Sequence, residues 1–164
     1  MLADELRALE VELADVRPTA VHAVGELRLG YRMVLGSRVA SRALMPLVEI
    51  DAADDDALYE ALRAFPWWEH FEPTSTFAIG SSKSPRSSLP AHYWVQRAKD
   101  AIVDAFRDHS GNRPSVDKKA PGIRFHLHLG EARHELSLDF SGEALHRRGY
   151  RQKGGRAPLK ENLA

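Results

Sequence analysis

The sequence IRFHLHLGEARHELSLDF, residues 123–140, alternates apolar and polar side chains through both of its halves. In residues 123–129, isoleucine, phenylalanine and leucine share one face, and arginine and histidine share the other. A period of two is typical of β-strands that are buried on one face. Residues 134–140 repeat the pattern, so the sequence predicts an antiparallel hairpin that turns through Glu131 and Ala132.

The polarity of the two faces favours one register for this hairpin. Pairing Leu127 with Leu136 on the apolar face sets His128 opposite Glu135 on the polar face. A slip of one residue would turn every side chain to the wrong face of the sheet, so we expect this register. It adds the pairs Phe125–Leu138 and Arg124–Asp139.

Helices and strands alternate along the rest of the chain. Helical spacing of apolar residues predicts helices, and apolar or alternating runs predict strands. The expected helices cover residues 2–10, 27–36, 54–65 and 91–109, and the expected strands cover residues 11–16, 20–24, 44–50 and 76–79. This order indicates an α+β fold, in which helices cover one face of a mixed sheet that ends in an antiparallel hairpin.

The composition is typical of an ordinary globular protein. The chain of 164 residues is 43% hydrophobic and 28% charged, and it is long enough for one domain or two small ones. It has no cysteine, which excludes disulfides and thiolate metal sites and favours a cytoplasmic protein. No apolar run reaches the roughly 18 residues of a membrane-spanning helix, so no membrane partner is expected.

Charge is distributed unevenly although the formal net charge is zero. Residues 1–60 hold 6 basic and 12 acidic residues, whereas residues 113–164 hold 11 basic and 6 acidic residues. A basic region of this kind favours a surface that faces a polyanion. A solvated linker that happens to be basic explains the same counts, and charge alone leaves both interpretations open.

Eight basic residues are the candidate contacts to RNA. They lie in or near flexible segments, where cationic side chains meet phosphates and a tyrosine such as Tyr150 stacks on an unpaired base. The eight are Lys83, Arg86, Lys118, Lys119, Arg147, Arg148, Arg151 and Lys153. For each one singly, a salt bridge to the folded domain stays an equal alternative. Lys99 ranks lower, because Asp100, Asp104 or the sheet offers it a structural partner.

Two histidines raise the alternative of a small metal-dependent enzyme. His126 and His128 would share one face of a strand, with Glu135 opposite, which is a geometry that permits metal binding. An exposed polar face with a cross-strand pair of His128 and Glu135 explains the same residues. The sequence has no Gly-x-Ser-x-Gly, Walker A or dinucleotide motif, and no catalytic centre is predicted in this chain.

Three aromatic residues raise the alternative of a protein-interaction domain. Trp67, Trp68 and Phe71 lie close together after a predicted helix. As an exposed patch they would dock a catalytic partner, because large exposed apolar patches mark interfaces. As buried side chains they would only anchor a loop, so their burial distinguishes the two alternatives.

Six segments together resemble one family in their order and spacing. They are residues 37–42 (SRVASR), 99–104 (KDAIVD), 113–117 (RPSVD), 136–142 (LSLDFSG), 145–151 (LHRRGYR) and 157–161 (APLKE). This combination resembles the N-terminal half of bacterial 23S rRNA guanine-N2 methyltransferases. The resemblance covers nearly the whole chain.

The resemblance implies a ferredoxin-like part followed by a THUMP domain, which is an RNA-binding module. Residues 1–28 would be an incomplete ferredoxin-like part, residues 29–141 the THUMP domain, and residues 142–164 a basic linker into a methyltransferase domain. That domain and its S-adenosylmethionine would lie beyond this chain, in cis or in trans, so no cofactor is expected here. The implied function is to position 23S rRNA for guanine-N2 methylation.

Overall fold

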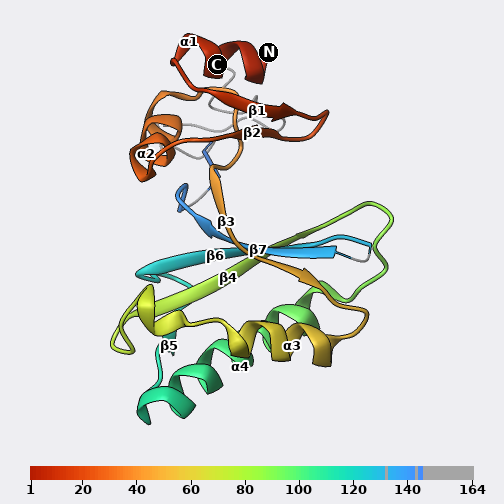
Figure 1. Cartoon of the computed structure of the whole chain (residues 1–164), viewed down its shortest axis with the longest axis vertical. Coiled ribbons are helices and arrows are strands. Elements are labelled where there is room, and N and C mark those ends of the chain that lie inside the picture. The colour runs from red at the N-terminus through yellow and green to blue at the C-terminus, as the bar shows by residue number, and fades with distance from the viewer. Residues whose placement is uncertain (132, 143, 146–164) are drawn as a thin grey trace, which may run out of the picture. The chain divides into compact units, whose positions relative to one another are not determined.

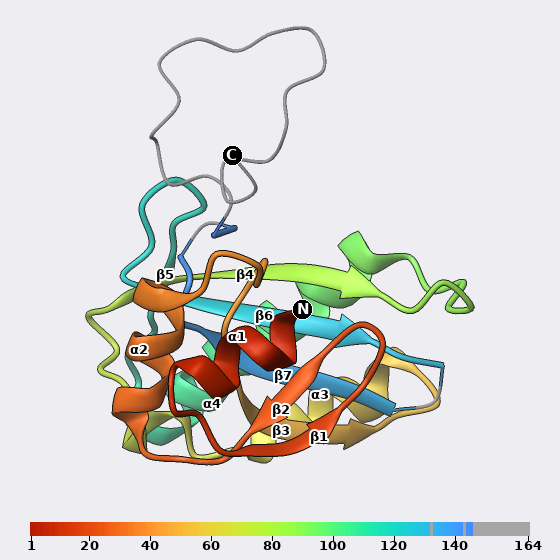
Figure 2. The same cartoon turned by 90° about the horizontal axis from the view of Figure 1, so that it is seen from above.

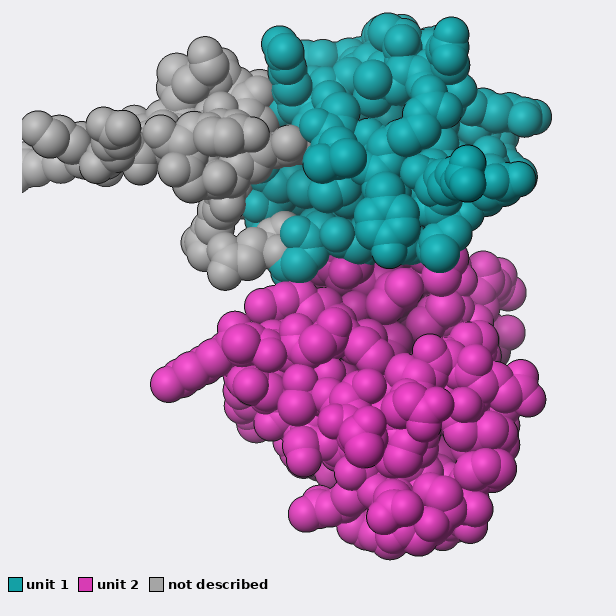
Figure 3. All heavy atoms as spheres, turned by 90° about the vertical axis from the view of Figure 1, so that its left-hand side faces the viewer, with its two compact units in different colours: residues 1–44, 140–164 teal, residues 45–139 magenta. Residues whose placement is uncertain are grey.

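The computed structural model of the protein describes residues 1–131, 133–142 and 144–145. The chain forms two compact units, which Figure 3 distinguishes by colour. Unit 1 contains residues 1–44 together with the segment from Phe140 onward, and unit 2 contains residues 45–139. The predictions for Arg147, Arg148, Arg151 and Lys153 lie outside the described residues.

Unit 1 pairs two helices with a small hairpin. Its elements are α1 (Leu2–Ala8), β1 (Leu13–Val16), β2 (Val21–Ala23) and α2 (Leu27–Gly36). The strands are antiparallel, with Leu13 opposite Ala23 and Val16 opposite Val21. The hairpin predicted around Pro18 is therefore confirmed, although both strands are shorter than expected.

Glu5 holds α1 against the turn that follows α2. Its carboxylate accepts hydrogen bonds from Ser37 Oγ at 2.6 Å and from the backbone N–H groups of Arg38 at 2.7 Å and Val39 at 3.3 Å. Burial acts to raise the pKa of Glu5, but these hydrogen bonds outweigh it, so the pKa is lowered. The charged form of Glu5 is thus part of the folded structure of unit 1.

Unit 2 is a five-stranded sheet with helices on one face (Figure 1). The elements in chain order are β3 (Leu44–Asp51), α3 (Asp55–Ala64), the 3-10 helix η1 (Trp67–Glu69), β4 (Thr76–Lys83), α4 (Ala91–Ser110), β5 (Ser115–Val116), β6 (Ile123–Leu129) and β7 (Arg133–Asp139). The strand order is β3-β7-β6-β4-β5, as Figure 2 shows from above. Helices and a mixed sheet confirm the α+β prediction.

The β6–β7 hairpin has the predicted register, with Leu127 opposite Leu136 and His128 opposite Glu135. The position of β4 beside β6 was not predicted. β4 runs parallel to β6 from Phe77 to Lys83, so it extends beyond the predicted end at residue 79. Glycine and serine are poor strand formers, and pairing with a neighbouring strand overrides that local preference here.

The core of unit 2 lies between the sheet and the two helices. The buried residues of α4 are Trp94, Ala98, Ala101, Ile102, Ala105 and Phe106. They pack with the aromatic rings of Trp67, Phe71, Phe77 and Phe125 in one cluster. At the start of α3, Asp54 caps the helix as predicted, since its Oδ1 accepts from the N–H of Ala57 at 2.8 Å.

Candidate nucleic-acid interface

β4 is the edge of its sheet along most of its length. β5 pairs only with Thr76 and Phe77, whereas β6 pairs with β4 as far as Lys83. Beyond Phe77, no other described strand lies on the outer side of β4. An edge strand presents unpaired backbone N–H and C=O groups, and residues 80–83 of this one are exposed.

A cavity of about 470 Å³ lies beside this edge. Residues 78–81 of β4 form one wall, where Ala78 and Gly80 leave room because their side chains are small. The other lining residues are His92, Val95 and Lys99 of α4, Val116 and Lys118 at and after β5, and Arg124 of β6. Positions spaced three and four apart share one face of a helix, so α4 turns a single face to the cavity.

The charged residues that line this cavity are all basic. Lys99, Lys118 and Arg124 line it without a carboxylate. Within the described parts of the chain, none of the three takes part in an ion pair. Burial and the nearby charge of Lys118 lower the pKa of Lys99, against the opposing charge of Asp100. The cavity is therefore lined by three cations that form no ion pair with the described residues.

Lys83 extends this basic surface along the strand. It lies on the same face of β4 as Ile79 and Ser81, because alternate strand positions share a face. It is exposed, and it also has no ion pair in the described residues. We call Lys83, Lys99, Lys118 and Arg124 the cationic edge.

Lys118 and Lys119 are held in a turn that follows β5. Asp117 Oδ1 accepts hydrogen bonds from the N–H of Lys119 at 2.8 Å and of Ala120 at 3.1 Å. These bonds lower the pKa of Asp117 and keep its carboxylate turned to the backbone. Lys118 reaches the cavity, whereas Lys119 is exposed and does not line it.

The structure thus separates the predicted basic residues. Lys83 and Lys118 share the cationic edge, and Lys119 lies in the neighbouring turn. Arg86 is exposed, and its Nη1 lies 3.8 Å from a carboxylate oxygen of Glu131, so its charge is partly compensated.

The cavity brings together Lys99, which the sequence analysis placed below the eight candidates, and Arg124, which was not among them. Asp100, Asp104 or the sheet was the structural alternative for Lys99, and its Nζ donates to Gln96 Oε1 at 2.8 Å. Asp104, an expected partner, accepts instead from the hydroxyl of Tyr59 at 2.8 Å and from Arg107 at 2.6 Å. The only local signal for Lys99 was its place beside the apolar face of a helix.

The prediction of an exposed polar face at the two histidines is wrong for His126, which is 7% exposed. Ser82 Oγ lies 2.9 Å from His126 Nε2 and 3.0 Å from His128 Nδ1, so one hydroxyl bridges both rings. Glu135 accepts from Ser137 Oγ at 2.7 Å instead of pairing with His128. No group of three potential metal ligands occurs in the part of the chain that the structure describes.

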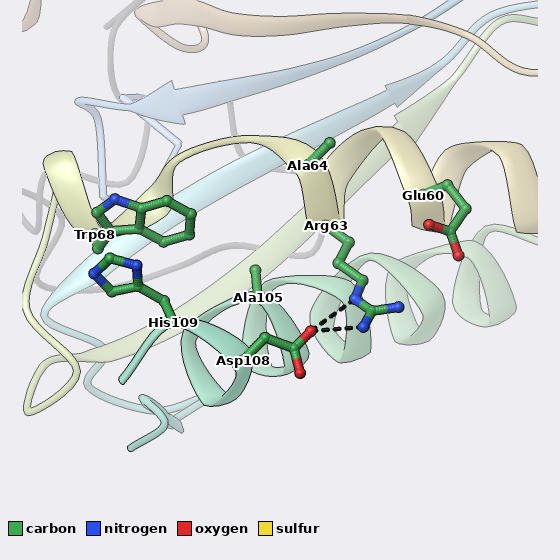
Figure 4. A pocket seen from close by; sticks show the side chains of 7 residues that line it. All are labelled: Glu60, Arg63, Ala64, Trp68, Ala105, Asp108 and His109. Carbon is green, nitrogen blue, oxygen red and sulfur yellow. Dashed lines mark hydrogen bonds and ion pairs between the residues drawn. The ribbon is translucent and has the colours of Figure 1, made fainter. Parts of the chain in front are cut away.

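Of the two alternatives for the aromatic residues, the structure favours buried anchors over an exposed patch. Trp67 is fully buried and donates its Nε1–H to the carbonyl of Leu62 at 2.6 Å, and Phe71 is 9% exposed. Trp68 alone reaches the surface, at 37% exposure, and its ring stacks on His109 at 4.0 Å (Figure 4). A single exposed ring does not make an apolar docking patch.

A second cavity, of about 380 Å³, lies between α3 and α4 beside this stack. Arg63 points across it to Asp108, with two hydrogen bonds of 2.9 and 2.6 Å (Figure 4). Glu60 adds a second carboxylate to the lining. Its acidic groups and its paired arginine suit a polyanion less well than the cationic edge does.

S-adenosylmethionine fits neither of these cavities. Its sulfonium group is a cation, which Lys99, Lys118 and Arg124 would repel. In the other cavity Asp108 is already paired with Arg63.

None of the helices in the described residues is both long and apolar enough to cross a membrane.

Comparison with known families confirms the resemblance found in the sequence. The family model of the THUMP domain matches residues 52–139, and the model of the RlmL ferredoxin-like domain matches residues 1–44. The first match covers unit 2 almost completely, and the second covers the helices and the hairpin of unit 1.

Similar proteins are ribosomal RNA large subunit methyltransferases K/L. The chain is 47% identical to the one from Syntrophotalea carbinolica and 46% identical to the one from Aeromonas salmonicida, over 100% of its own length. It spans 23% of the length of each. A crystal structure of a possible methylase from Clostridium difficile 630 has the same fold, with a TM-score of 0.81 at 24% identity, over 99% of this chain and 43% of that one.

Proposed function

The chain belongs to the THUMP domain family, with an RlmL ferredoxin-like domain before the THUMP domain, and from this premise we propose that it binds RNA through the cationic edge. The RNA is large-subunit ribosomal RNA, 23S in bacteria, which the module positions for an S-adenosylmethionine-dependent guanine-N2 methyltransferase domain in the cytoplasm. The names of the relatives support the choice of RNA, and the surface of unit 2 supports the place of contact.

One observation carries the proposal: Lys83 on the edge strand, and Lys99, Lys118 and Arg124 around the cavity beside it, form no ion pair with the described residues. From Phe77 to Lys83 the strand spans about 20 Å, at about 3.3 Å a residue, which is long enough for several phosphates in succession. The outward N–H groups of an edge strand add neutral hydrogen-bond donors. Such a surface binds a nucleic-acid backbone mainly through its phosphates.

Contacts of this kind position an RNA without reading its sequence. A rigid α+β body that grips the backbone would leave the target base to the catalytic domain. We include Arg86, Lys119 and the linker residues Arg147, Arg148, Arg151 and Lys153 as further contacts. Arg86 would exchange its long ion pair with Glu131 for a phosphate.

The test is a fluorescence anisotropy titration of the whole chain against a 23S rRNA hairpin and a matched duplex DNA across a salt series. We expect tighter binding to the RNA and an affinity that falls as salt rises. Replacing Lys83, Lys118 and Arg124 together with alanine should weaken binding and reduce the salt slope by about two, at about 0.7–0.9 for each lost phosphate contact.

Arg133→Ala is the matched control. It also removes a positive charge from a strand of the same sheet, but Arg133 pairs with Asp51 at 3.0 Å and lies on β7, away from the cationic edge. The RNA affinity of Arg133→Ala and the slope of its salt dependence should stay close to those of the unchanged chain. The control removes one charge and the triple variant three, so equal losses of binding free energy for each charge removed would show that only net charge matters, and would refute this interface.

A further inference from the structure

We propose that the cavity beside β4 is a phosphate pocket, in which Lys99, Lys118 and Arg124 together hold one internal phosphodiester of the bound RNA. This inference rests on the proposed function and makes it specific. The cationic edge would then contain one site where a phosphate enters the protein, while its other contacts stay on the surface.

The charged residues in the lining of the cavity fit an anion. They are Lys99, Lys118 and Arg124, from a helix, a turn and a strand that meet only in the folded unit. Lys99 and Lys118 repel each other, since the charge of Lys118 helps to lower the pKa of Lys99. An anion between them removes that repulsion.

The burial of Lys99 and its lowered pKa support this assignment. Lys99 is half-buried, so its ammonium group has lost part of its hydration. Burial and Lys118 lower its pKa, which shows that the folded protein disfavours this charge. A bound phosphate would reverse both effects, because it is a charged acceptor at short range. Lys99 would therefore respond to the ligand more strongly than an exposed lysine does.

Neutral donors complete the pocket. Ser81 lines the cavity and offers a hydroxyl group. Half of the backbone N–H groups of residues 78–83 point away from β6, because parallel pairing uses alternate residues. A volume of about 470 Å³ exceeds that of a phosphate, so an adjoining ribose also fits.

The experiment is an NMR titration of the whole chain, with labelled lysine side chains and backbone amides. The probes are inorganic phosphate, a short oligoribonucleotide with a 5′-hydroxyl, and the same oligoribonucleotide with a 5′-phosphate. We expect saturable shifts at Lys99, at Lys118 and at the amides of residues 79–81 with all three. Equal affinity for the two oligoribonucleotides supports an internal phosphodiester. A strict need for the 5′-phosphate overturns that part of the proposal and assigns a terminal phosphate.

Two variants test the residues. Lys118→Met and Lys99→Met should each weaken binding of the oligoribonucleotide about tenfold or more, because a charge-assisted hydrogen bond contributes at least about the 1.4 kcal/mol that a tenfold change represents. Lys118 is exposed, so its variant should fold even if Lys99→Met does not. Arg133→Met is the control, since it removes one positive charge from β7, outside the cavity and outside the proposed RNA contacts.

The outcomes separate this inference from the proposed function. If Lys118→Met and Arg133→Met lose the same RNA affinity and phosphate produces no saturable shifts, the pocket is refuted, although RNA binding by the surface stands. If phosphate saturates the pocket while the 23S rRNA hairpin does not bind, the phosphate pocket stands without the RNA function. A loss of RNA affinity that is confined to the Lys99 and Lys118 variants supports both the phosphate pocket and the proposed RNA binding.

Discussion

Lys99 and Lys118 line one cavity of unit 2 although 18 positions of sequence lie between them, and the charge of Lys118 helps to lower the pKa of Lys99. Two ammonium groups at this separation repel each other while no anion is bound. Their proximity becomes favourable when an anion binds between them.

Removing Lys118 should raise the pKa of Lys99 toward its ordinary value. In Lys118→Ala the like charge is gone, while the burial of Lys99 stays the same. The pKa is measurable from the side-chain resonances of Lys99 in a pH titration followed by NMR. Lys119→Ala should leave it unchanged, and a similar rise in that variant would contradict the arrangement of the cavity.

Unit 1 should lose stability in acid through Glu5. Its pKa is lowered in the folded state, so its contribution is fully present above the unfolded value, about 4.3, and is lost as the pH falls through the folded value. In urea titrations of the unchanged chain, the free energy of unfolding should therefore fall below about pH 4.3.

Glu5→Gln should remove this pH dependence and lower the free energy of unfolding of unit 1 by about 1–2 kcal/mol near pH 7, because an amide accepts less strongly than a carboxylate. Glu12→Gln is the control. Glu12 is exposed, and its side chain makes no hydrogen bond with the described residues. A steeper acid loss in Glu5→Gln than in the unchanged chain would contradict the assignment.

Substituting the two neighbouring tryptophans should destabilise unit 2 to very different degrees. Trp67→Ala opens a cavity in the core and leaves the carbonyl of Leu62 without its donor, so it should cost about 3–5 kcal/mol. Trp68→Ala removes one half-exposed ring stacked on His109 and should cost about 1 kcal/mol. Thermal unfolding followed by circular dichroism checks this order, and a reversed order would show that the burial of the two rings is misassigned.

Ser82→Ala should destabilise unit 2 through the histidines. The hydroxyl bonds with His126 Nε2 and with His128 Nδ1, and His126 is buried, so the cost should be about 1–2 kcal/mol. Ser81→Ala, at an exposed neighbouring position, should cost less than about 0.5 kcal/mol. Denaturant midpoints of the two variants test the difference, and equal midpoints would mean that the bridge does not stabilise the fold.

Much of the fold was predictable because its signals are local. The β6–β7 hairpin has the predicted pairs because a period of two determines which face each side chain occupies, and one face must be buried. The start of α3 and the end of α4 followed from Asp54 and from Gly111, which adopts a φ of 72° that favours glycine.

The burial of His126 and of Trp67 was not predictable in the same way. Alternation placed His126 on a polar face, but whether such a face meets water depends on what covers it. A pair of adjacent tryptophans is compatible with a core or with a surface, and only packing against Phe71 and Phe125 makes Trp67 part of the core.

The chain alone therefore specified its helices, the register of its last hairpin and its family. The candidate site depended on long-range pairing. β4 pairs with β6 across 46 residues of sequence. The sequence pattern of a strand does not show which distant strand is its parallel partner. Lys99, Lys118 and Arg124 acquire a common cavity only when α4, the turn after β5 and β6 assemble around β4, because the local sequence of each segment does not distinguish them from other basic residues.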